Sequence, residues 1–219
     1  MEAPSVKSPK KAAVAAPPTS KFSVPKNLRL AGGIALGAVL LIAWFVIVSG
    51  KRKAEFANRA LEQVRSAAEA GNLPLAASEL QKVITTYSGT AAAQEAVITL
   101  NQVRLLTGQQ ELAAVSLQDF IKSKPDKKYL TPGYALLGRA LENTNRAEEA
   151  AQAFRSASDN ADVDYLRAKY LNDAGRAYVA AGKKDDAIAV YRKIIQDYPE
   201  SNSKVEAQVR LAELTQGKM

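Results

Sequence analysis

Between residues 168 and 201, apolar side chains recur at spacings of three and four, with polar side chains between them. This is the period of an amphipathic α-helix rather than of a strand. Two helices are predicted here, because Gly182 interrupts the pattern and Pro199 ends it. The small residues Gly175 and Ala187 allow the two helix backbones to approach closely. The larger apolar positions are Leu171 and Tyr178 on the first helix, and Tyr191 and Ile194 on the second.

The pattern of this hairpin occurs four times, at a step of 37 residues that joins Ala76, Ala113, Ala150 and Ala187. In the third copy the matching positions are Tyr134, Leu137, Gly138, Leu141, Phe154 and Ala157. In the second copy they are Val97, Leu100, Leu117, Phe120 and Pro125, and Asn101 replaces the packing glycine. The first copy is the most degenerate, with Gly71 at its turn and Leu80 and Val83 on its second helix. Four small residues on one unbroken step predict four stacked hairpins.

This repeat resembles the tetratricopeptide (TPR) repeat, a helix–turn–helix unit of about 34 residues. The resemblance covers residues 54–219 and is strongest in the third and fourth copies. It implies an all-α fold, a TPR-type α-solenoid of about four helical hairpins, because one hairpin cannot bury its apolar face alone. A C-terminal capping helix is expected from about Lys204 to Gln216, with Ser201 at its N-terminal cap. We find no strand pattern.

The N-terminal region has a different composition from the repeats. Residues 1–29 are rich in Ala, Pro, Ser and Lys, and they predict a disordered basic tail because they cannot bury enough apolar area to fold. Residues 30–50 carry no charge, and at 1.5 Å per residue they span about 31 Å, the thickness of a bilayer core. They predict a single transmembrane helix, with a cleaved signal peptide as the competing interpretation. Residues 51–219 then form the TPR-like helical repeat domain.

Within the predicted transmembrane helix, Gly33 and Gly37 form a GxxxG pattern. Such a pattern is a candidate packing face between membrane helices, although glycine is also common in membrane helices for other reasons. A homo-oligomer formed through this face therefore stays open as an alternative.

The net charge of +8 comes from the N-terminal region alone. Residues 1–29 hold six Lys or Arg and one Glu, residues 51–53 add three basic residues, and the chain from residue 54 onward holds 21 of each sign. A neutral repeat domain lacks the basic surface of a nucleic-acid-binding protein, so we expect no nucleic-acid partner.

The residues that carry most enzyme chemistry are missing or unpatterned. The chain has no Cys and no His, which excludes disulfides, thiol chemistry, Cys/His zinc sites and histidine-based catalysis. The acidic run at residues 160–164 is similar to the start of a calcium loop, but Tyr165 replaces its glycine and Leu171 its last glutamate. We therefore expect no metal, no cofactor, no catalytic residue and no enzyme activity.

What remains is a surface for binding other proteins. In TPR proteins the first helices of the hairpins line a concave groove, and the resemblance assigns nine residues to it. They are Ile98, Gln102 and Leu105 in the second hairpin, Arg139, Glu142 and Asn143 in the third, and Lys169, Asn172 and Arg176 in the fourth. Arg139 and Arg176 lie one period apart and are candidates for binding a carboxylate or peptide carbonyls. A solvated helix face is the alternative for all nine. The basic clamp of chaperone-binding TPR domains is not reproduced.

The order of tail, span and repeats resembles that of the YfgM-type ancillary subunits of the Sec translocon. It implies a scaffold at the bacterial inner membrane, with the N-terminus cytoplasmic and the repeat domain periplasmic, whose partners are the translocon and periplasmic chaperones. The basic residues at 51–53 argue against this orientation. The alternatives are a coordinator of outer-membrane or peptidoglycan assembly, a structural oligomer, and a non-catalytic subunit of a membrane enzyme complex.

Overall fold

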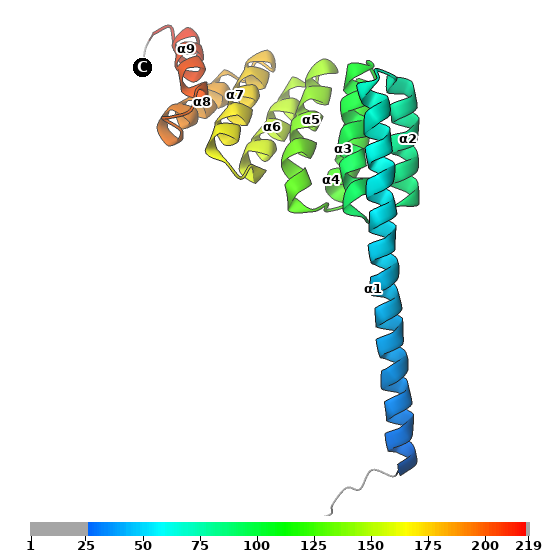
Figure 1. Cartoon of the computed structure of the whole chain (residues 1–219). Coiled ribbons are helices and arrows are strands. Elements are labelled where there is room, and N and C mark those ends of the chain that lie inside the picture. Colours follow the sequence, from blue (N-terminus) through cyan, green and yellow to red (C-terminus); the bar gives the residue numbers. More distant parts are fainter. Residues whose placement is uncertain (1–25, 218–219) are drawn as a thin grey trace, which may run out of the picture. The chain divides into compact units, whose positions relative to one another are not determined.

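The computed structural model describes residues 26–217, with side chains from Val39 onward except those of Ala67 and Glu69. All regular secondary structure in this part is helical (Figure 1), as the sequence predicts. A short 3-10 turn, η1, precedes the fifth helix. The bounds are α1 Lys26–Glu69, α2 Leu73–Thr86, α3 Ala91–Leu106, α4 Gln110–Lys122, η1 Lys127–Tyr129, α5 Leu130–Asn143, α6 Ala147–Asn160, α7 Asp164–Ala180, α8 Lys184–Asp197 and α9 Ser203–Thr215.

The chain divides into two units, residues 1–47 and 48–219. In the first unit, α1 begins at Lys26, four residues before the predicted span. Its large apolar side chains are 58% to 68% exposed: Val39, Leu40, Leu41, Ile42, Trp44, Phe45, Val46 and Ile47. Within the described residues, no helical segment combines the length and the apolar character that a membrane span requires. The predicted tail up to residue 25, and the surroundings of Gly33 and Gly37, lie outside the described residues.

In the second unit, consecutive helices pair into the predicted hairpins (Figure 1). The end of α1 packs with α2 and α3 around Ala57, Leu61 and Val64. Further along, α3 packs with α4, α5 with α6, and α7 with α8. The final helix, α9, packs on α7 and α8, within one residue of the predicted bounds of the capping helix. Four hairpins and a closing helix are therefore confirmed.

In the third and fourth hairpins, the two helices meet where an aromatic ring of the second helix packs on a glycine of the first. We call this contact the seam. A Cβ atom added at Gly138 would lie 2.6 Å from the ring of Phe154, and one added at Gly175 would lie 2.6 Å from the ring of Tyr191. Both rings are at most 1% exposed. Because real Cβ atoms do not approach so closely, only glycine fits these two positions, as the sequence predicts.

The second hairpin uses a different seam. Asn101 occupies the glycine position and is fully buried. Its side-chain nitrogen donates to the Val97 carbonyl oxygen at 2.8 Å and to the Ser116 hydroxyl at 3.1 Å, while its oxygen accepts from Arg104 at 3.1 Å. The facing residue is Leu117, which is smaller than the aromatic rings of the later hairpins. A larger residue on one helix is thus matched by a smaller one on the other, and every polar atom of the buried amide has a partner.

The turns within the hairpins also follow the 37-residue step. Gly71, Gly108, Asn145 and Gly182 lie one period apart and all have positive φ, between 61° and 79°. Glycine adopts this conformation freely, and asparagine is the side chain that tolerates it best. The chain therefore makes the same left-handed turn four times, once without glycine.

Candidate protein-binding groove

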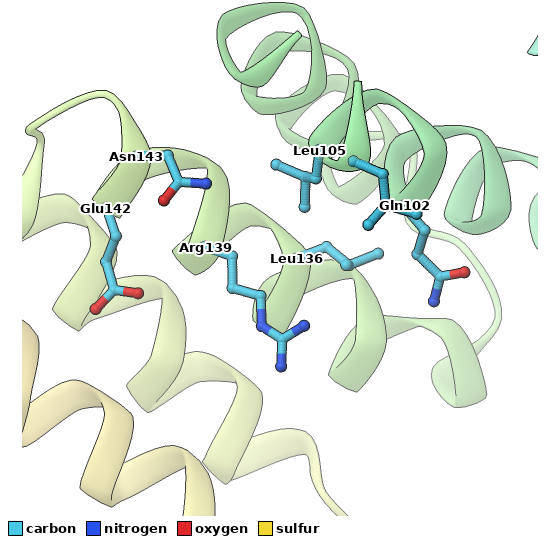
Figure 2. A pocket seen from close by; sticks show the side chains of 7 residues that line it. Gln102, Leu105, Leu136, Arg139, Glu142 and Asn143 are labelled. Atoms are coloured by element: carbon cyan, nitrogen blue, oxygen red, sulfur yellow. The ribbon is translucent and has the colours of Figure 1, made fainter. Parts of the chain in front are cut away.

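A groove of about 470 Å³ lies between α3 and α5 (Figure 2). Both are first helices of their hairpins, so the groove lies on the face that the TPR resemblance implies. Five of the nine predicted residues line it, namely Gln102, Leu105, Arg139, Glu142 and Asn143. Two more residues, Leu106 and Leu136, complete the lining and were not predicted from the sequence.

One side of this groove is apolar. Figure 2 shows Leu105 of α3 and Leu136 of α5 pointing into the space between the two helices. Leu106 is 74% exposed, the highest value among the large apolar side chains described. Leu106 could have been predicted from the 37-residue step, because it lies one period before the predicted residue Asn143. Leu136 does not lie one period from any predicted residue, so the step could not have indicated it.

The other side of the groove carries a cation, Arg139. Arg139 extends from α5 and forms no ion pair with any described residue (Figure 2). Arg176, at the same template position of α7, donates to Asp173 at 2.7 Å. The difference arises three residues earlier in each helix, where α5 has Leu136 and α7 has Asp173. Arg139 thus keeps its N–H donors for a ligand.

Glu142 lies on the other side of Arg139 from Leu136 (Figure 2). Its pKa is raised above the ordinary value, mainly because partial burial disfavours the charged carboxylate. Arg176 and Arg139 oppose this shift, and Asp173 adds to it. Burial likewise raises the pKa of Tyr170 on α7, against the effect of Arg139. Charged groups of both α5 and α7 therefore shift the pKa of Glu142.

The remaining predicted residues do not line this groove. Ile98 is buried in the core, where it lies against Gly133 of α5. Asn172 is also buried, 7% exposed, and its side-chain oxygen has no hydrogen-bond partner among the described residues. Lys169 and Arg176 are exposed on α7, with the Lys169 ammonium 4.9 Å from the centroid of the Tyr170 ring. The angular positions of Ile98 and Asn172 on their helices place these two side chains in the interior.

The repeated hairpins and the groove on their first helices define an α-helical repeat protein of the kind that binds other proteins. A family model described as "Tetratricopeptide repeat-like domain" matches residues 27–216, so the chain belongs to this family. Its fold is typical of non-catalytic scaffolds. In the described residues, no group of three acidic side chains is placed to hold a metal ion.

Several solved structures share this fold. The crystal structure of MamA protein has a TM-score of 0.60 at 21% identity, over 75% of this chain and 83% of that one. A tetratricopeptide repeat protein from Parabacteroides merdae has a TM-score of 0.58 at 12% identity, over 73% and 60%. A putative kinesin light chain repeat structure from Podosopora anserina has a TM-score of 0.57 at 17% identity, over 73% and 85%. No curated protein matches the chain in sequence. At these identities the structures show the fold alone.

Proposed function

We propose that this protein is a membrane-anchored TPR scaffold that binds a partner protein in the groove between α3 and α5. The observation that carries the proposal is Arg139, which pairs with no described residue, beside the apolar wall formed by Leu105, Leu106 and Leu136. An isolated surface arginine is common, and so is an exposed leucine. The two together in a concavity of about 470 Å³ match a short peptide segment, which offers apolar side chains next to carbonyl or carboxylate oxygens.

The anchor in this proposal is the segment at residues 30–50. It is uncharged over 21 residues and has basic residues on both flanks. The large apolar side chains described between Val39 and Ile47 are exposed, and a lipid environment would cover them. Lysines in the preceding tail would add attraction to anionic headgroups.

For location and partner we propose the bacterial inner membrane, with the N-terminus cytoplasmic and the repeat domain periplasmic. The support is the order of segments in the sequence, which resembles that of the YfgM-type ancillary subunits of the Sec translocon. In this setting the scaffold would act by raising the local concentration of a translocon-associated chaperone near the membrane. A coordinator of cell-envelope assembly and a non-catalytic subunit of a membrane enzyme complex are the alternatives, and they share the same anchor and groove.

Site-specific photocrosslinking in cells tests the groove. A photoreactive phenylalanine analogue in place of Leu106 should crosslink to a partner, and the additional change Arg139→Glu should abolish the product. The matched control is the same analogue in place of Leu112, which is 51% exposed on the second helix of the same hairpin. Equal crosslinking from both sites, or none affected by Arg139→Glu, would contradict the groove. The identity of the crosslinked protein separates the translocon from the envelope-assembly alternative.

A labelling experiment tests the orientation, using the absence of native cysteines. Ser8→Cys lies in the tail and Asn202→Cys lies at an exposed position before α9. In intact cells with a permeabilised outer membrane, an impermeant maleimide should label the second variant only. Labelling of the tail variant alone would reverse the topology and remove the periplasmic assignment.

A further inference from the structure

The loops that join one hairpin to the next differ sharply in charge. All of them lie at one end of the helices, because each hairpin runs out and back, and they follow the 37-residue step. At matching positions, residues 85–91 hold no charge, 122–128 hold four lysines and one aspartate, 159–165 hold three aspartates, and 196–202 hold one aspartate and one glutamate. Only residues 122–128, which we call the lysine loop, are basic. The neutral total of the repeat domain conceals this separation of charge.

Two hydrogen bonds fix the lysine loop to the beginning of α3. The backbone N–H of Asp126 donates to the side-chain oxygen of Gln94 at 2.8 Å. Directly after the loop, the hydroxyl of Tyr129 donates to the carbonyl oxygen of Ala91 at 3.0 Å. Tyr129 is also buried. The backbone of the loop therefore has a defined place against α3.

The basic residues at 51–53 reach the same end of α3. The Lys53 ammonium donates to the carbonyl oxygen of Ser88 at 2.9 Å, two residues before Thr90, which caps α3. Residues 51–53 directly follow the uncharged segment at residues 30–50. The lysine loop therefore lies at the end of the repeat domain from which the chain leads back to the proposed anchor.

The lysine side chains of the loop are exposed, and little neutralises them. Lys122 and Lys127 are 76% and 77% exposed, with ion pairs to single carboxylates at 3.8 and 3.4 Å. Lys124 and Lys128 are also exposed and form no ion pair with any described residue. Because exposed ion pairs are weak, the loop presents most of its positive charge to its surroundings.

Helix termination does not account for the lysine at position 124. Lys124 lies two positions after the end of α4 and has a φ of 55°. A residue with a Cβ atom is disfavoured in this left-handed conformation, which glycine adopts freely. The four turns within the hairpins place glycine or asparagine in it. The charge of Lys124 therefore serves no purpose in ending α4.

We propose that the lysine loop and residues 51–53 bind the anionic headgroups of the bilayer that holds the anchor, so that the repeat domain contacts the membrane at its first two hairpins. This inference rests on the anchor proposed above. The acidic loops at residues 159–165 and 196–202 are repelled by the same surface. This repulsion restricts the contact to the first two hairpins.

The chemistry of the lysine loop favours a lipid surface over other phosphate-bearing ligands. Lysine is a compact hydrated charge on a flexible stem, whereas the forked donors of arginine suit a phosphate group of fixed position. The loop contains no arginine. The aromatic ring that follows it, Tyr129, is buried and offers no face on which a nucleobase could stack. Several flexible ammonium groups match a layer of headgroups whose phosphates are not fixed in place.

The test measures how closely each end of α4 approaches the bilayer in the full chain. A nitroxide is attached to Ser123→Cys in the lysine loop, and the matched control carries it on Gln109→Cys, at the other end of α4. Both sites are exposed, and the 13 residues of α4 separate them by about 20 Å. The chain is placed in nanodiscs that contain a lipid with Ni²⁺ chelated at its headgroup, which relaxes a nitroxide only on close approach.

The lipid composition separates charge from simple proximity. In nanodiscs of equal parts phosphatidylcholine and phosphatidylglycerol, we expect strong relaxation at position 123 and little at position 109. In phosphatidylcholine alone, relaxation at position 123 should fall to the level at position 109. Added salt should have the same effect in the mixed nanodiscs, because screening shortens the reach of the attraction to about 3 Å at 1 M salt.

Single substitutions locate the contact. A basic residue near an anionic surface raises the ratio of docked to undocked protein by about fivefold, so Lys124→Gly and Lys128→Gln should each lower this ratio by about fivefold. Lys124→Gly should fold at least as well as the wild type, because φ at this position is 55°. The matched control is Lys184→Gln, which removes an exposed lysine at the turn end of the fourth hairpin and should leave the ratio unchanged.

Several results would overturn the inference. They are equal relaxation at the two sites in mixed nanodiscs, equal relaxation at position 123 in the two lipid compositions, and a wild-type ratio in both Lys124→Gly and Lys128→Gln. Release of the loop by inorganic phosphate that replaces chloride at constant ionic strength would assign it to a free phosphate instead. An oligodeoxythymidylate that binds the chain in phosphatidylcholine nanodiscs, but not the Lys124→Gly variant, would assign it to nucleic acid.

Failure of the anchor gives a different result. A chain without a membrane span would not co-purify with phosphatidylcholine nanodiscs, and the anchor and the lipid contact would then both be removed. A chain that enters these nanodiscs but shows no relaxation at position 123 in the mixed ones keeps the anchor and loses the lipid contact alone. Crosslinking from Leu106 tests the groove between α3 and α5 separately.

Discussion

The third and fourth hairpins are built on one plan, yet they present different chemistry. In both, an aromatic ring packs on a glycine that directly precedes an exposed arginine, Arg139 or Arg176. Among the described residues, the arginine has no ion-pair partner in the third hairpin and is bound to a carboxylate in the fourth. A single upstream residue, Leu136 or Asp173, makes this difference.

The repeat thus fixes the interior of each hairpin and leaves its surface free to vary. Positions that face the neighbouring helix must satisfy packing density, so glycine and ring recur together. Positions on the exposed face carry no such constraint. The exposed side chains can therefore differ between hairpins whose interiors repeat. Substitutions at buried and at exposed positions test how independent the two sets are.

The largest effect is expected at the shared seam. Gly138→Ala and Gly175→Ala would each place a Cβ atom 2.6 Å from a buried ring. Overpacking of a dense core costs about 1–3 kcal/mol, so each change should lower the free energy of unfolding by about 2 kcal/mol. Urea denaturation followed by circular dichroism measures it.

Gly133→Ala is the internal control for this prediction. A Cβ atom at Gly133 would lie 3.7 Å from its nearest neighbour, an ordinary contact. The change should therefore be neutral or stabilise by up to about 1 kcal/mol through better helix propensity. If Gly138→Ala lowered the free energy of unfolding no more than Gly133→Ala does, the packing of the ring on the glycine would not constrain this position.

The next largest effect on the free energy of unfolding is expected at the left-handed turns. Substitutions there should change it in opposite directions in the fourth and third hairpins. Gly182→Ala forces an alanine to φ near 71° and should cost about 1–2 kcal/mol. Asn145→Gly relieves a mild strain at φ 61° and should stabilise by less than about 1 kcal/mol. Thermal unfolding of the two variants measures both. Equal destabilisation by both changes would show that the two turns are not equivalent.

Two tyrosines of the fourth hairpin, Tyr178 and Tyr191, should also respond in opposite directions. Tyr191→Phe removes a buried hydroxyl without a partner among the described residues and should stabilise by about 1 kcal/mol. Tyr178→Phe removes a hydroxyl that accepts from Arg155 at 3.3 Å and should destabilise by about 0.5 kcal/mol. Urea titration of both variants gives the comparison. A loss of stability in Tyr191→Phe would show that its hydroxyl has a structural partner.

The smallest effect concerns Glu142. Its raised pKa means that the folded state binds this proton more tightly than the unfolded state. The resulting stability is present below the ordinary pKa of 4.5 and is lost as the pH rises through the folded pKa. Glu142→Gln removes this dependence, so its stability relative to wild type should rise over that window, as urea titrations at a series of pH values would show.

Asp173→Leu tests the electrostatic effect of α7 on Glu142. It gives α7 a leucine at the position that Leu136 occupies in α5. It removes a like charge near Glu142 and frees Arg176, and both changes should lower the pKa of Glu142, measured by carbon NMR of its carboxyl group. The ion pair that is lost is partly exposed, with Arg176 at 45% and Asp173 at 19%, so it should contribute about 1 kcal/mol and global stability should change little. An unchanged pKa would show that the two helices are not coupled electrostatically.

The regular part of this fold was predictable because its constraints are local. The spacing of three and four located the helices from α2 to α9, and the 37-residue step matched them into pairs. Gly175 and Tyr191 were predicted to form a seam, and they do. Even the Asn101 exception was visible, although its explanation needed the three hydrogen bonds that satisfy its amide.

The groove was predictable only in part. Five residues of its lining followed from template positions, while Ile98 and Asn172 proved to be buried. Their spacing marks them as part of a helix face, but a rotation of the helix by a fraction of a turn decides whether a side chain at the edge of that face is inside or outside. Leu136 joined the groove because α3 lies opposite it, which no pattern within α5 records.

The sequence by itself determined the helices, their pairing, the glycine seams and the left-handed turns, because each depends on residues within one period and on steric rules that act over a few bonds. Only the tertiary structure decided which polar groups lack partners among the described residues. For Arg139, the sequence shows that Leu136 replaces the carboxylate found at Asp173, but only the packing of the helices decides whether another helix supplies a partner. Whether the Tyr191 hydroxyl is unsatisfied likewise depends on its distances to side chains of other helices. Those distances are set by how the helices pack, and electrostatic and hydrogen-bond energies change steeply over the same few ångströms.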